Sequence, residues 1–86
     1  MMVVFEMHVV PGEDVSTIFS DEVKRETGLQ VLRHDELARA GLSGMPAPKP
    51  GTSVLYVLVK EREARWVHQK LEASNAVAGF QMHPVG

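Results

Sequence analysis

Residues 53–60 read Ser-Val-Leu-Tyr-Val-Leu-Val-Lys, a run whose β-branched and aromatic residues predict a strand. Successive side chains of a strand point to opposite faces, so the odd-numbered residues 55–59 share one face and the even-numbered residues 54–58 share the other. Both sets are apolar: Leu55, Val57 and Val59 on one face, and Val54, Tyr56 and Leu58 on the other. Such a strand belongs in the middle of a sheet that is covered on both sides. We expect helices of the same chain to cover one side and a second copy of the chain to cover the other.

The whole chain has 86 residues, no cysteine and a formal net charge of −2. This length predicts a single small domain over residues 1–86, and small domains often gain missing burial by association. The absence of cysteine excludes disulfides, thiolate zinc sites and cysteine nucleophiles. Lysine and arginine are scattered, which argues against a nucleic acid as the main ligand. We expect no cofactor.

The apolar start of the chain, Met1 to Val10, is interrupted by Glu6 and His8. It lacks the basic region and the cleavage site of an export signal, and it is too short and too polar to span a membrane. We therefore expect a cytoplasmic protein that does not contact a membrane. The alternation of apolar and polar residues over this stretch predicts a strand whose odd-numbered face is core.

A helix is predicted from Asp14 to Thr27. Asp14 or the preceding Gly12 is expected to cap its start, and Gly28 is expected to end it. A short second strand is predicted over 29–34. One or two helical turns should follow over 35–41 with Asp35 as the N-cap.

Residues 42–52 contain three prolines and two glycines, which exclude both a strand ladder and a helix interior. We expect a long exposed loop here. After the strand at 53–60, a second long helix is predicted over 61–75. Gly79 is expected to form a turn, and the last strand should run from Phe80 to His83 and stop at Pro84.

This order of elements is the split βαβ arrangement, an α+β, ferredoxin-like βαββαβ fold with a four-stranded antiparallel sheet and two helices on one face. The first and third strands should be central, and the fourth should lie beside the first. The predicted helix-side core comprises Phe5, Met7, Leu55 or Tyr56, Phe80, Met82, Ile18, Phe19, Val67 and Leu71. The other sheet face, with no helix over it, is the expected surface of a homodimer or homotrimer.

Pro11-Gly12 at the first turn and the order of elements resemble small regulatory domains, namely ACT domains and PII-like signalling proteins. The ACT resemblance implies a small-molecule ligand near Gly12 at a subunit interface. The PII-like resemblance implies that residues 34–52 contact ligands or partners. The first and last strands also resemble those of dimeric α+β barrel proteins such as muconolactone isomerase and antibiotic monooxygenases, in which the open sheet faces enclose a pocket.

Four polar residues fall on one face if the first and last strands pair: Glu6, His8, Gln81 and His83. The interpretation that we favour is that they are ordinary polar residues on a partly solvent-exposed sheet face or in an oligomer interface. A histidine beside a carboxylate can also act as a general acid or base near neutral pH, and Glu6, His8 and His83 are the catalytic candidates. Two histidines and a glutamate could hold a divalent metal, but we assign no metal site.

The ligand-binding candidates are Gly12, Lys49, Tyr56 and Gln81. Lys49 would meet an anionic ligand if its loop folded over a cleft. Two functions stay open: a homo-oligomeric regulatory protein that binds a small molecule at a subunit interface or under residues 35–52, and a dimeric barrel enzyme that uses His8 and His83 as acid and base. Trp66 lies off the apolar stripe of its helix and could contact a partner.

Overall fold

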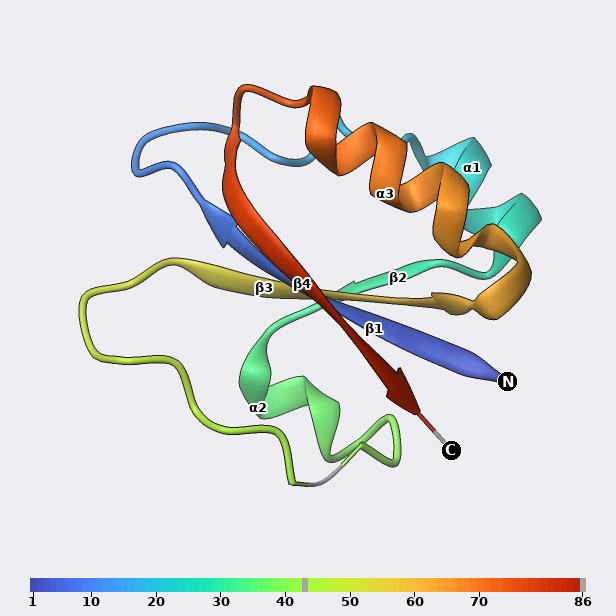
Figure 1. Ribbon diagram of the computed structural model, residues 1–86, viewed down its shortest axis with the longest axis horizontal. Coiled ribbons are helices and arrows are strands. Elements are labelled where there is room, and N and C mark those ends of the chain that lie inside the picture. Colours follow the sequence, from blue (N-terminus) through green and yellow to red (C-terminus); the bar gives the residue numbers. More distant parts are fainter. Residues whose placement is uncertain (43, 86) are drawn as a thin grey trace.

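The computed structural model describes residues 1–42 and 44–85, so that Ser43, within the loop expected at 42–52, and Gly86 lie outside the described residues. Four strands form one antiparallel sheet in the order β2-β3-β1-β4 (Figure 1). The strands are β1 (Met2–Val9), β2 (Gln30–Leu32), β3 (Val54–Lys60) and β4 (Val77–Val85). The α+β class is confirmed, as are the central places of the first and third strands and the place of the fourth beside the first.

The helices lie on both faces of the sheet. Figure 1 shows α1 (Asp21–Thr27) and α3 (Ala64–Ala73) on one side and the short α2 (His34–Leu37) on the other. A 3₁₀ turn, η1 (Glu61–Glu63), leads into α3. The prediction of helices on one face alone is therefore wrong. None of the helices in the described ranges has the length and apolar character needed to cross a membrane.

The first helix begins seven residues later than Asp14, the predicted start. Asp14 Oδ1 accepts a hydrogen bond from the Ser16 N–H at 2.9 Å, which closes a local turn instead of capping a helix. The N-cap of α1 is Ser20, whose Oγ accepts from the Val23 N–H at 3.2 Å. Gly28 ends the helix with a φ of 74°, as predicted.

The second helix also has a different cap. Arg33 is the N-cap residue of α2, and its backbone N–H donates to Glu36 Oε1 at 2.9 Å. Asp35 lies inside the first turn, where an acidic side chain interacts favourably with the positive end of the helix dipole. The assignment of Asp35 as N-cap is thus wrong, although a helix does form there.

A first hydrophobic core lies between the sheet and the helices α1 and α3. Alternate residues of β1 and β3 supply its floor, and Leu55 packs against it, whereas Tyr56 points to the opposite face. α1 itself buries no residue, and the contacts at its ends come from the flanking Phe19 and Leu29. The buried members are Val3, Phe5, Met7, Phe19, Leu29, Val57, Val59, Val67 and Leu71.

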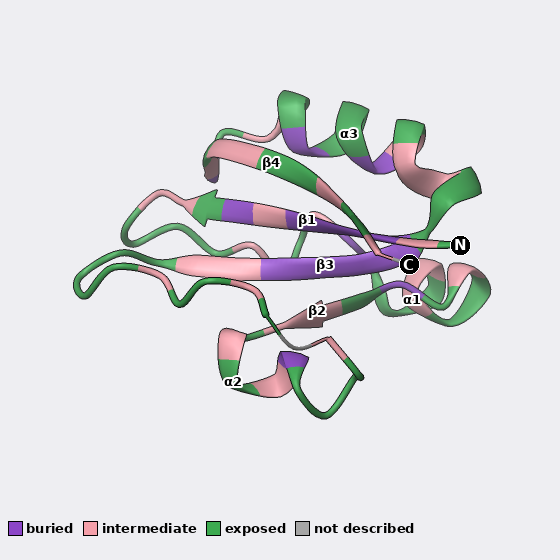
Figure 2. Cartoon of the chain, turned by 60° about the horizontal axis from the view of Figure 1, so that its bottom comes forward, coloured by how far each residue is buried: buried purple, intermediate pink, exposed green. Residues whose placement is uncertain are grey.

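A second core occupies the opposite face, which the sequence led us to assign to a partner subunit. Val4, Tyr56 and Leu58 are buried there beneath Leu37 of α2. Leu42 and Met45, from the proline-rich segment, pack against the same cluster. β3 is accordingly buried along most of its length (Figure 2).

This second core overturns one expectation, because the opposite face does carry a helix. Most described residues of 42–52 are exposed, as predicted for a loop, but Leu42, Met45 and Pro48 are half-buried. A proline-rich segment cannot form a ladder, but its apolar side chains still gain free energy by leaving water. The chain itself thus covers the apolar centre of this face, and burial of Tyr56 to 1% exposure requires no second copy.

The last strand is longer than predicted. Gly79 lies within β4 opposite His8, beside a shift of register between His8 and Val9, so the turn expected at Gly79 is wrong. A glycine inside a strand often accompanies such an irregularity. Pro84 also lies within β4, where it is tolerated because β4 is an edge strand.

Candidate functional site

A cavity of about 390 Å³ lies where the proline-rich segment approaches the face of the sheet opposite α1 and α3. We call it the loop cavity. It brings together four predicted site residues, two of them from β1, one from β3 and one from the segment. Its lining consists of Glu6, His8, Pro46, Ala47, Pro48, Lys49, Thr52, Val54 and Tyr56.

The register of the sheet places the strand residues of the loop cavity. Glu6 lies opposite Tyr56 on β3 and opposite Gln81 on β4, and His8 lies opposite Val54. Directly opposed residues of antiparallel strands point to the same face. Glu6 therefore stands in the middle of a row of polar side chains, between Tyr56 and Gln81.

Glu6 contacts two histidines. His8 Nε2 lies 2.8 Å from Glu6 Oε2, and because an ionised carboxylate only accepts, the imidazole N–H is the donor. His83 Nε2 lies 3.3 Å from Glu6 Oε1, but without the alignment of a hydrogen bond. This nitrogen of His83 is thus a buried polar atom with no hydrogen-bond partner among the described residues.

The contact between Glu6 and His8 is the chemically informative one. Glu6 is 21% exposed and His8 is 47% exposed, so the carboxylate is the buried member and the imidazole is the accessible one. A carboxylate that holds one ring nitrogen sets the orientation of the ring and leaves the other nitrogen available for proton transfer. His83 contacts the same carboxylate but does not line the loop cavity.

Tyr56 is a buried residue whose side chain lines the loop cavity. Burial, and next the negative charge of Glu6, raise the pKa of the Tyr56 phenol, so the hydroxyl keeps its proton and remains a donor. None of the side-chain hydrogen bonds found among the described residues uses this hydroxyl. The Tyr56 ring packs beside His34, with ring centroids 5.9 Å apart.

Local hydrogen bonds hold the proline-rich segment over the sheet. His34 Nε2 donates to the Met45 carbonyl at 2.9 Å, which ties the segment to α2. Thr52 donates from its N–H to the Lys49 carbonyl at 3.2 Å, closing a turn whose middle residues are Pro50 and Gly51. Gly51 has a φ of 85°, which suits the third position of a type II turn with proline before it. The hydrogen bond of this turn therefore holds the Lys49 backbone at the edge of the loop cavity.

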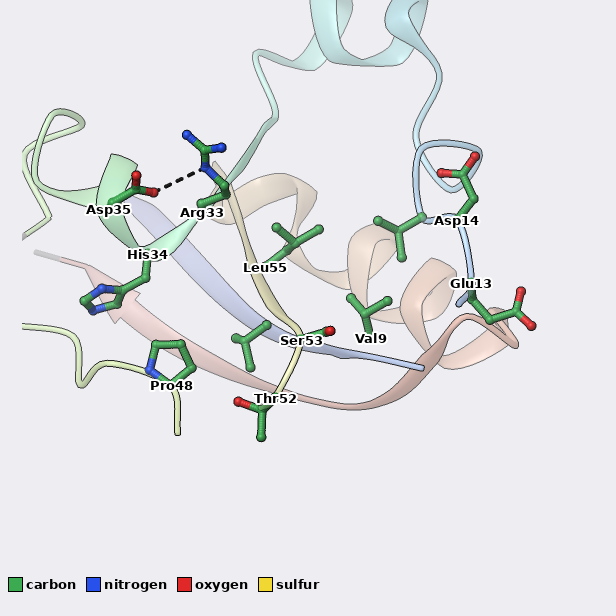
Figure 3. A pocket seen from close by; sticks show the side chains of 12 residues that line it. Val9, Glu13, Asp14, Arg33, His34, Asp35, Pro48, Thr52, Ser53 and Leu55 are labelled. Atoms are coloured by element: carbon green, nitrogen blue, oxygen red, sulfur yellow. Dashed lines mark ion pairs between the residues drawn. The ribbon is translucent and has the colours of Figure 1, made fainter. Parts of the chain in front are cut away.

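A larger, more open groove of about 700 Å³ lies at the neighbouring end of the sheet and shares Pro48, Thr52 and Val54 with the loop cavity. Figure 3 shows Glu13 and Asp14 on one side of it and residues 33–35 on the other. Its arginine, Arg33, already pairs with Asp35 at 3.3 Å. The Ser16 backbone N–H lowers the pKa of the exposed Asp14. We prefer the loop cavity because its polar groups converge, whereas the charges of the groove are spread apart or paired.

The structure does not bring every predicted residue to this site. Gly12 lies in the turn after β1 with a φ of 85°, and it lines neither the loop cavity nor the groove. Gln81 shares the sheet face of Glu6 but is exposed and outside the loop cavity. Within the described part of the chain, no group of three histidine, aspartate or glutamate side chains could hold a metal ion.

Trp66, a candidate partner contact, packs within its own chain. Its ring lies 5.8 Å from that of Phe19, and Lys70 Nζ lies 5.9 Å from the Trp66 ring centroid. Trp66 is one of the partly buried residues around the first core. The contacts of its own chain therefore account for its position without a partner.

Sequence analysis missed two groups of residues that line the loop cavity. Val54 has the same parity as Tyr56, so the strand pattern could have placed it on this face once the register with β1 was known. Pro46, Ala47, Pro48 and Thr52 carry no such signal, because a proline-rich segment has no period that reports which way it folds.

No protein-family model, curated protein or solved structure matches this chain. The resemblances to ACT domains, PII-like proteins and dimeric α+β barrels therefore stay predictions. The loop cavity is therefore the basis of the function proposed for this chain.

Proposed function

We propose that this protein binds a small molecule in the loop cavity, as a regulatory binding protein whose ligand lies under the proline-rich segment. One observation carries the proposal: Glu6, His8, Lys49 and Tyr56 converge on one cavity although they come from separate parts of the sequence. The cavity volume of about 390 Å³ is in the range of small-molecule sites. Apolar walls with a few convergent polar groups are also typical of such sites.

The arrangement of the sheet supports a ferredoxin-like interpretation of the fold. The order β2-β3-β1-β4 with α1 and α3 on one face agrees with it, and α2 is the departure. Self-association into a dimer or trimer stays a prediction, but the surface left for it is smaller than the whole sheet face that the sequence suggested. That surface is the part of the opposite face along β4, where Gln81 is exposed and His83 and Val85 are half-buried.

A screen of metabolites by thermal unfolding tests the binding proposal. A ligand that binds only the folded protein, present at about 100 times its Kd, should stabilise the protein by about 2.7 kcal/mol. For a domain of this size we expect an increase in melting temperature of roughly 10–20 °C. The same ligand should have little effect on Ala47→Trp, because the indole would fill the loop cavity.

A matched control for this substitution is Ala78→Trp, which adds the same side chain at an exposed position of β4 outside the loop cavity. This variant should respond to the ligand as the wild type does. A hit that stabilises Ala47→Trp as strongly as Ala78→Trp would place binding elsewhere. A broad screen without any hit would remove the proposal.

A second function, an acid–base enzyme acting on a small organic molecule, is favoured by the 2.8 Å contact between Glu6 and His8. His8 would take a proton from the bound molecule and return it, while Glu6 holds the ring. The sequence suggested His8 and His83 as the acid and the base. His83 contacts Glu6 but does not line the loop cavity, so His8 alone is proposed as the proton carrier.

Deuterium exchange separates the enzyme from the binding protein. A ligand found in the screen is incubated with the protein in D₂O, and its carbon-bound hydrogens are followed by NMR. An enzyme should replace one of them with deuterium, and His8→Gln should slow the exchange by about 100-fold or more, as expected for the loss of a general base. His83→Gln should have a smaller effect. If the ligand binds but exchanges no hydrogen, the binding function stands and acid–base catalysis on that ligand is excluded.

A further inference from the structure

We infer that the loop cavity selects a small organic acid, with a carboxylate held by Lys49 and Tyr56 and an apolar body lying on the prolines. The inference rests on the proposed function and names the chemical class of its ligand. It follows from the donors, the charges and the walls of the loop cavity.

Lys49 provides the cation. None of the ion pairs found among the described residues involves Lys49, although the loop cavity also contains Glu6. The turn from Lys49 to Thr52 fixes where the lysine backbone sits. An ammonium group held beside an apolar cavity and lacking an anionic partner is suited to bind an anion.

Tyr56 provides the second donor. Its side chain is 1% exposed, lines the loop cavity and keeps its proton because burial raises the pKa of the phenol. No side-chain hydrogen bond found among the described residues uses this hydroxyl, so it can donate to an acceptor on a ligand. A carboxylate has two oxygens, one for the Lys49 ammonium and one for the Tyr56 hydroxyl.

Glu6 is the group that would oppose an anion, and one of its oxygens already accepts a hydrogen bond from His8. His8 donates to one oxygen at 2.8 Å, and His83 lies 3.3 Å from the other. The His8 N–H directed at the carboxylate offsets part of the negative charge that the ligand meets. A ligand ammonium, in contrast, would face Lys49 and would compete with His8 for one oxygen of Glu6.

The remaining walls are apolar. Pro46, Ala47 and Pro48 form the side toward the segment, and Val54 forms part of the side toward the sheet. These residues offer few hydrogen bonds, so they suit the hydrocarbon part of a ligand. Their place beside Lys49 predicts a molecule with one charged end.

Three probes of nearly equal size test the charge preference: phenylacetate, phenylacetamide and 2-phenylethylamine. Each is titrated into the ¹⁵N-labelled 86-residue chain, and the amide resonances of the non-proline residues in the range 46–56 are followed by NMR. We expect saturable shifts with phenylacetate. Because charge-assisted hydrogen bonds exceed neutral ones by roughly a factor of two in strength, phenylacetamide should bind about three- to tenfold more weakly. The amine should bind most weakly.

Three variants identify the groups responsible. Lys49→Ala should weaken phenylacetate binding by about three- to tenfold and leave phenylacetamide binding unchanged, whereas Lys49→Arg should retain the preference for the acid. Tyr56→Phe keeps the buried ring and should weaken the binding of both phenylacetate and phenylacetamide. The control is Lys60→Ala, which removes an exposed lysine at the far end of β3 and should change nothing.

The outcomes distinguish the two proposals. If phenylacetamide or the amine binds in the loop cavity as tightly as phenylacetate, the loop cavity remains a binding site but the inference about organic acids is wrong. Unchanged acid binding in Lys49→Ala would also overturn it. If no probe shifts these resonances at millimolar concentration, the inference about organic acids fails, whereas the small-molecule function is decided by the metabolite screen.

Discussion

Leu37→Ala is expected to lower the free energy of unfolding by about 2–5 kcal/mol, the range for truncating a buried leucine. Leu37 is 2% exposed and packs with Val4, Tyr56 and Leu58. It is the only residue of the four-residue helix α2 that is buried, so the helix has no other large apolar contact with the sheet. Urea unfolding, followed by the fluorescence of the single tryptophan, Trp66, measures the loss.

Arg39→Ala is the matched control for Leu37→Ala. Arg39 follows α2 and is exposed, and its loss should change the stability by no more than about 0.5 kcal/mol. Equal effects of the two substitutions would mean that α2 does not cover the sheet. The opposite face would then be open to a second copy of the chain, as the sequence first indicated.

Phe5→Ala is expected to cost about 3–5 kcal/mol, because the ring is fully buried in the first core. Its centroid lies 6.2 Å from that of Phe80, and it faces Val57 across the pair of central strands. Stabilities of domains of this size lie around 5–15 kcal/mol, so this one truncation would remove a large share of the stability. Urea unfolding again measures the effect.

Phe80→Ala removes the other ring of this pair and should cost clearly less, because Phe80 is half-buried and lies on the edge strand β4. If Phe5→Ala does not fold at all, Phe5→Leu provides the comparison, since it keeps much of the apolar volume. A Phe80→Ala variant as unstable as Phe5→Ala would show that the edge strand carries as much of the core as the central one.

The sequence predicted the centre of the fold because β3 has an unambiguous pattern. An apolar run on both faces requires two layers of cover whatever the rest of the chain does. The start of α1 was predicted wrongly, since the Asp14 carboxylate is equally able to cap a helix or to close a local turn. The Ser20 cap and the burial of Phe19 just before the helix both favour the later start at Asp21.

The candidate site was predictable in part. Strand parity placed Glu6 and His8 on one face, and the position of Lys49 in a loop between β2 and β3 made contact with a cleft conceivable. Gly12 and Gln81 were included on weaker grounds, a resemblance and a shared face, and neither reaches the loop cavity. The role of Tyr56 depends on which face of β3 lies under α2. Both faces of this strand are apolar, so its sequence does not show which one that is.

By itself, the sequence determined that the chain folds around an apolar central strand, that its class is α+β, and that helix α1 ends at Gly28. These features follow from local chemistry and from side-chain periodicity within single elements. Only the tertiary structure decided that α2 and the proline-rich segment cover the second face and enclose a cavity over Glu6, His8 and Tyr56. That outcome depends on contacts between residues far apart in the sequence, such as Met45 with His34 and Leu37 with Tyr56, and no local pattern encodes them.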